Sequence, residues 1–157
     1  MNYTFADYEN AILSALAPLG SYLKTLKGYS GQFDDRSVWE QFLANFPGVL
    51  VEIAAAEYTP TNLPFPPLIC MQTVTAQLYL GSLSWRDQKA ARSGGVEVVG
   101  VYTILNDIRK YLQGKTLGLE IRPLAPQAEF KINHDLGSRV VLYGARYQII
   151  NDRIMEE

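Results

Sequence analysis

The chain has 157 residues, of which 48% are hydrophobic and 19% are charged. Its 14 basic and 16 acidic residues give a formal net charge of −2, which argues against the strong positive field of a nucleic-acid binder. Length and composition are typical of one folded domain spanning residues 1–157. No stretch approaches the ~18 consecutive apolar residues of a membrane span, and residues 1–7 lack the basic and apolar regions of a signal peptide.

An amphipathic helix is expected over residues 5–16, where apolar side chains recur at helical spacing. Thr4 or Asp7 can cap it, and Pro18 favours its end. The other elements expected in the first 67 residues are a strand at 22–29, a short helix at 36–43, a strand at 49–54 and an extended proline-rich loop at 58–67.

The longest strand signal covers residues 68–83, which alternate between apolar and polar side chains. One face carries Val74, Ala76, Leu78 and Leu80, and the other carries Thr73, Thr75, Gln77 and Tyr79. We expect the first face to lie in the core and the second to face solvent or a partner.

A second long helix is expected over residues 96–113, where apolar residues keep the helical period. Its stripe consists of Val98, Val101, Leu105, Ile108 and Leu112. Gly114 suits the C-terminal cap, and strands are expected at 117–124, 128–133 and 139–151. This order of elements predicts a single α+β domain with a largely antiparallel sheet and helices packed on one face.

Residues for catalysis or metal binding are scarce. Cys70 and His134 are the only cysteine and histidine, so an intrachain disulfide, a paired-cysteine zinc site and a histidine cluster are excluded by count. We expect Cys70 to be buried and His134 to lie in a solvated turn. No glycine-rich phosphate loop is present. The sequence therefore predicts no enzyme, with no catalytic, cofactor-binding or metal-binding residues; a small enzyme is the alternative from another class.

Several blocks of the sequence carry a family resemblance. They are residues 86–95, 101–109 and 112–119, preceded by 46–51 and the opening helix. In this order they resemble the Mu-like phage protein family encoded among head-completion and tail genes, and the resemblance covers nearly the whole chain. It implies a structural virion protein of a contractile-tailed phage or phage-like particle, located in the tail or neck and assembled in the host bacterial cytoplasm.

The role implied by the resemblance is that of a tail terminator. Such a protein forms a ring, expected to be hexameric, that caps the tail tube and sheath and joins them to the head-side neck. The implied partners are other copies of the chain, tail tube and sheath proteins, and neck or head-completion proteins. No membrane and no specific nucleic acid is expected, although DNA could pass through the ring. The alternative is a head-completion adaptor that forms a twelve-fold ring on the portal side.

A polar arm between the two longest elements is the candidate assembly interface. Residues 84–95 carry one large aromatic side chain and three basic ones, Trp85, Arg86, Lys89 and Arg92. Tryptophan and arginine are favoured at interfaces because each offers a large contact area with a polar group. A solvated loop is the alternative interpretation. The polar face of residues 68–83 is a second surface available to a neighbouring subunit.

Overall fold

The computed structural model describes residues 2–29, 31, 34–60, 68–83, 92, 99–132 and 140–155. Its elements are α1 (Phe5–Leu16), η1 (Ala17–Ser21), β1 (Thr25–Gly28), α2 (Arg36–Ala44), β2 (Gly48–Pro60), β3 (Leu68–Leu83), α4 (Val101–Leu112), β4 (Ala125–Lys131) and β5 (Val140–Met155). The strands form one five-stranded sheet in the order β1-β2-β3-β5-β4. Only the β1–β2 pair is parallel among these strands, which confirms the predicted α+β class with a largely antiparallel sheet.

The first helix forms where its sequence predicts, because reciprocal hydrogen bonds between Thr4 and Asp7 cap its N-terminus. The Thr4 hydroxyl accepts from the backbone N–H of Asp7, while the Asp7 carboxylate accepts from the backbone N–H of Thr4. This capping box satisfies two amide groups that have no partner within the helix. One stripe of the helix, Tyr8, Ile12 and Leu16, is then fully buried against the sheet.

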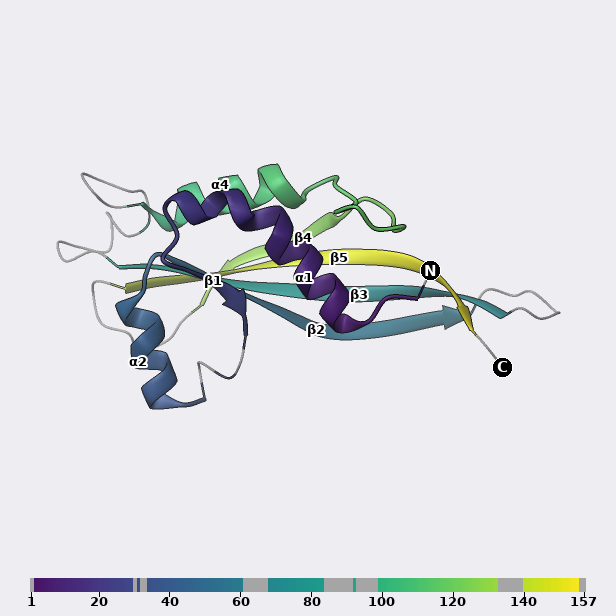
Figure 1. The fold of residues 1–157 in the computed structure, drawn as a ribbon, viewed down its shortest axis with the longest axis horizontal. Coiled ribbons are helices and arrows are strands. Elements are labelled where there is room, and N and C mark those ends of the chain that lie inside the picture. The colour runs from purple at the N-terminus through teal and green to yellow at the C-terminus, as the bar shows by residue number, and fades with distance from the viewer. Residues whose placement is uncertain are drawn as a thin grey trace.

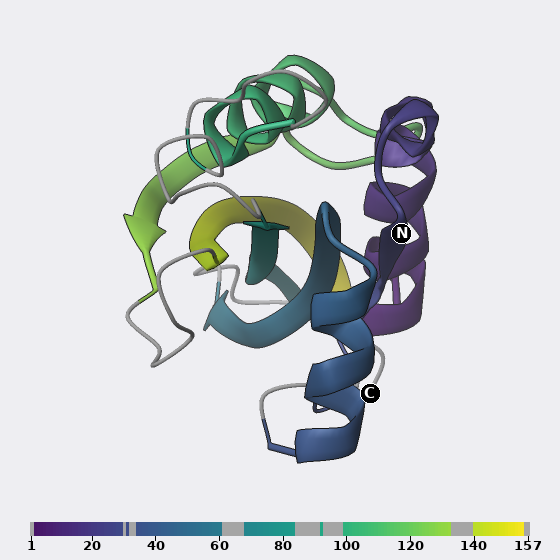
Figure 2. The same ribbon diagram turned by 90° about the vertical axis from the view of Figure 1, so that its left-hand side faces the viewer.

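The two faces of the sheet are covered differently. The longer helices α1 and α4 lie alongside each other on one face (Figure 1), over a core that includes Val51, Leu78 and Ile149. The short helix α2 lies on the opposite side of the strands from α4 (Figure 2), where Phe42 packs with Leu50 in a second, smaller cluster. Most of the second face therefore has no helix over it among the described elements.

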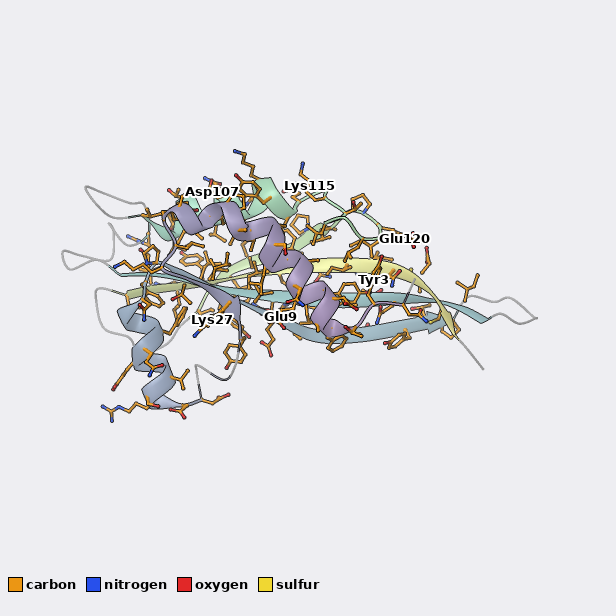
Figure 3. The ribbon with its side chains drawn as sticks, in the orientation of Figure 1. Tyr3, Glu9, Lys27, Asp107, Lys115 and Glu120 are labelled. Carbon is orange, nitrogen blue, oxygen red and sulfur yellow. The ribbon has the colours of Figure 1, made fainter. Side chains whose placement is uncertain are left out.

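Two tyrosines hold the α1 and α4 regions together. The Tyr22 hydroxyl donates to the Asp107 carboxylate of α4 at 2.6 Å, and the Tyr3 hydroxyl accepts from the backbone N–H of Glu120 at 2.8 Å. Tyr3 and Glu120 lie toward one end of the molecule and Asp107 toward the other (Figure 3). The paired helices are thus tied at both ends.

A buried hydrogen-bond network joins α1 to three strands. Tyr8 donates through its hydroxyl to Gln72 Oε1 at 2.7 Å, and Asn151 Nδ2 donates to the Tyr8 hydroxyl at 3.1 Å. Gln72 Nε2 in turn donates to the Tyr58 hydroxyl at 2.9 Å. Gln72 and Asn151 are essentially inaccessible to solvent, and buried amides of this kind are stable only when they are hydrogen-bonded.

Several predicted elements differ from the structure in type or in bounds, and three of them differ most. The second long helix begins at Val101 rather than residue 96, since Gly100 has extended backbone angles and serves as its N-cap; residues 96–98 lie outside the described part. The expected strand at 117–124 is a series of turns, because Leu117 and Gly118 both have positive φ. Residues 58–60 of the expected loop belong instead to strand β2, where Pro60 pairs with Cys70 of β3; residues 61–67 lie outside the described part.

The β4 strand contains a proline that sequence reasoning takes for a strand breaker. Pro126 is tolerated there because β4 is an edge strand and its pairing with β5 shifts register between Pro126 and Ala128. Proline lacks a backbone N–H, so within sheets it is confined to edges and bulges. On its inner side, β4 is tied to α4 by a two-pronged ion pair between Arg109 and Glu129.

Candidate assembly surface

The sheet face opposite α1 and α4 carries a row of connected aromatic and charged side chains. At one end of this row, the Tyr79 hydroxyl donates to Glu52 Oε2 at 2.7 Å, and the Tyr79 ring lies 5.2 Å from the ring of Tyr29. Burial and the hydrogen bond to Glu52 raise the pKa of Tyr79. Tyr79 therefore stays a hydrogen-bond donor at neutral pH.

The row continues across β3, β5 and β4 through Arg146. Arg146 Nε donates to Gln77 Oε1 at 3.2 Å, and the guanidinium lies over the Phe130 ring, 5.4 Å from its centroid. Gly144 makes this packing possible, because a Cβ at that position would come within 2.5 Å of the Phe130 ring. We call these side chains, Tyr29, Glu52, Gln77, Tyr79, Phe130 and Arg146, the open-face row.

The open-face row includes part of the polar face expected on β3. Thr73, Thr75 and Tyr79 are partly exposed, whereas Gln77 is only 6% exposed because β5 and Phe130 lie beside it. Sequence reasoning does not single out Glu52, Phe130 or Arg146. For Glu52 the sequence does offer a signal. Glu52 alternates with the apolar residues Val51 and Ile53, and this alternation places its side chain on the sheet face opposite the core.

Of the four predicted interface residues, only one can be located. Trp85, Arg86 and Lys89 lie outside the described residues, as does His134. Arg92 is partly buried and lies near Tyr143. A hydrogen bond with Tyr102 and burial raise the pKa of Tyr143, and the positive charge of Arg92 opposes that shift. Arg92 is therefore close enough to Tyr143 of β5 to act on it electrostatically.

Side chains suited to catalysis or metal binding do not cluster anywhere in the described part of the chain. No cluster of three or more histidine, cysteine or carboxylate side chains suited to a metal ion occurs there. Cys70 is buried, as expected. A shallow pocket between α4 and β4 contains Arg109 and Glu129, whose charged groups are already paired with each other. The absence of enzyme activity stays a prediction.

Residues 4–135 match the family model described as Bacteriophage Mu, Gp37. The chain belongs to this bacteriophage Mu family. Membership confirms the resemblance to Mu-like phage proteins and makes this Gp37-family chain a phage structural, tail-related and virion-associated protein. Comparison with curated proteins finds no match. Within the described residues of the Gp37-family chain, no helix is long and apolar enough to span a membrane.

Proposed function

We propose that this Gp37-family protein is a tail terminator, which forms a six-membered ring on the end of the tail tube and sheath and joins them to the head-side neck. The proposal rests on family membership and on one structural observation. The open-face row exposes tyrosine, arginine and phenylalanine on a rigid sheet with no described helix over most of it. Tyrosine and arginine are enriched among the residues that contribute most of the binding energy at protein interfaces, and phenylalanine is enriched at interfaces in general.

The open-face row is ordered before any partner arrives. Tyr79 is fixed by Glu52, and Arg146 is fixed by Gln77 and Phe130. Fixing these side chains in advance lowers the entropy lost when a neighbour binds. A surface of this kind suits permanent assembly in a particle.

The sheet edges are poor sites for strand addition from a neighbour. The edge strand β1 has only four residues, and the opposite edge strand β4 contains Pro126 and a register shift. Short, bulged or proline-containing edges oppose uncontrolled pairing between sheets. We therefore expect neighbouring subunits to contact each other through side chains. A ring closes only if each subunit is rotated by the same angle relative to the next one.

Phage that lack this protein are expected to make tails of irregular length that do not join heads. A terminator stops growth of the tube and provides the surface to which the neck attaches, so both functions fail together. Electron microscopy of lysates tests this, with the same phage supplied with the protein in trans as the control. Tails of normal length without heads would instead support the adaptor on the portal side, and normal particles would contradict both roles.

A further inference from the structure

Charge is distributed unevenly along the chain. The described residues between 2 and 60 include seven acidic and three basic ones, which give a net charge of −4. Those between 68 and 155 include four acidic and eight basic ones, Arg153 among them, which give a net charge of +4. Strand β3, at the start of the second region, contains no charged residue. The small net charge of the whole chain therefore hides two regions of opposite charge.

The fold keeps these two regions apart in space. The sheet order β1-β2-β3-β5-β4 places the strands of the first region at one edge and the charged strands of the second at the other, with uncharged β3 between them. Helix α1 contacts β1 and β2, whereas α4 contacts β3 and β5. Viewed along the sheet, α1 and α2 lie on one side of the molecule, and α4 and β4 lie on the other (Figure 2). We call the described residues 2–60 the acidic side and the described residues 92–155 the basic side.

Ion pairs do not remove the charge difference between the two sides. Arg36 pairs with Glu40 within the acidic side. On the basic side, Arg109 pairs with Glu129, and a second pair joins Arg122 to Asp152. Each of these pairs removes one positive and one negative charge from the same side, so the net charge of that side is unchanged. Exposed and oppositely charged groups remain on the two sides, such as Asp34 and Glu57 on one and Lys115 and Lys131 on the other.

The open-face row has the same polarity. Its carboxylate, Glu52, comes from β2 on the acidic side, and its guanidinium, Arg146, comes from β5 on the basic side. Gln77 of β3 is the strand partner of both residues and lies between them. The separation of charge therefore extends across the sheet face that has no helix over most of it.

We propose that the acidic side of one subunit contacts the basic side of the next subunit in the ring. This inference rests on the ring proposed above and assigns its subunit contact. A ring needs a head-to-tail interface built from two unlike surfaces of the same subunit, and these two sides lie at opposite edges of the sheet. Opposite charges attract in this arrangement, whereas a two-fold dimer would bring like charges together. The charge distribution thus favours a ring over a closed dimer.

Two one-sided variants and their combination test the assignment. The first replaces three exposed acidic residues, with Asp34→Lys, Glu40→Lys and Glu57→Lys. The second replaces three exposed lysines, with Lys110→Glu, Lys115→Glu and Lys131→Glu. Either set reverses the net charge of one side, so neighbouring subunits would meet with like charges. Self-association of each one-sided variant is expected to weaken at least about 100-fold.

The combined variant carries all six substitutions. Its two sides again have opposite charges, and its formal net charge of −2 equals that of the wild type. We expect it to associate at least about 10-fold more tightly than either one-sided variant. A general effect of net charge on solubility or folding would not produce this recovery.

Circular dichroism confirms that each variant is folded, and size-exclusion chromatography with light scattering measures its assembly. Lys24→Ala with Lys110→Ala is the control that should assemble like the wild type, since it removes one exposed positive charge from each side. Rings formed by a one-sided variant, or no recovery in the combined variant, would overturn the assignment while leaving the ring intact. A monomeric wild-type protein would contradict the ring itself.

The salt dependence of wild-type assembly is a second measurement, which needs no folded variant. Raising the salt concentration from about 0.1 M to about 1 M shortens the screening length from about 10 Å to about 3 Å. Association between oppositely charged sides is expected to weaken about 10-fold or more over this range. Rings that are equally stable or more stable at about 1 M salt would overturn the assignment.

Discussion

A subunit with Trp85→Ala, Arg86→Ala and Arg92→Ala is expected to fold normally and to fail to cap tails. The three positions belong to a polar segment of the sequence that ends in Gly94 and Gly95. Replacing surface residues of this kind usually changes the free energy of unfolding by no more than about 0.5 kcal/mol. At an interface, the same side chains can each contribute about 2 kcal/mol or more, and a ring repeats that loss at every contact.

Negative-stain microscopy of particles made with the triple variant is the measurement, and we expect tails of irregular length or tails without heads. Lys24→Ala with Lys110→Ala is the control for lost positive charge, because both side chains are exposed outside the segment. The interface role of the segment would be disproved in either of two ways. If the variant does not fold, these residues belong to the core. If the variant folds and caps tails normally, these residues are not part of the interface.

Leu105→Ala is expected to lower the free energy of unfolding by about 2–5 kcal/mol. Leu105 is only 5% exposed on α4 and lies in the main core with Ile104 and Ile108. Truncating it removes apolar contact area and leaves a cavity, because neighbouring side chains in a close-packed core relax only partly. A change of this size is a large fraction of the total stability of a small domain.

Urea denaturation followed by circular dichroism measures the effect of Leu105→Ala. Lys110→Ala is the control on the same helix, since Lys110 is exposed and its truncation should shift the free energy of unfolding by less than about 0.5 kcal/mol. An equal midpoint for the leucine variant and wild type would show that this side of α4 does not hold the domain together.

The sequence predicts best the elements whose local signals and tertiary environment agree. Strand β3 has the predicted bounds, because its alternation matches a sheet with one fully buried face. The opposite case is residues 117–124. Leu117, Leu119 and Ile121 alternate as in a strand and do pack against the core, but they do so from turns that include two positive φ angles. Periodicity alone does not separate these outcomes.

The open-face row could not be predicted, because its contacts depend on strand register. Gln77 meets Arg146 because the two residues are direct partners in the β3–β5 pairing, although 69 positions separate them in the sequence. A shift of one residue would move Arg146 to the other face. The hydrogen bonds that connect Tyr8 with Tyr58 depend in the same way on a buried amide, Gln72, that lies in an otherwise apolar stripe of β3.

Electron cryo-microscopy of the tail end nearest the head tests the central claim most directly. If this Gp37-family protein is the tail terminator, averaged density should show six copies of it in one closed ring, seated on the last ring of the tube and sheath. Twelve copies in contact with the portal, or the absence of this protein from the junction between tail and neck, would contradict that role.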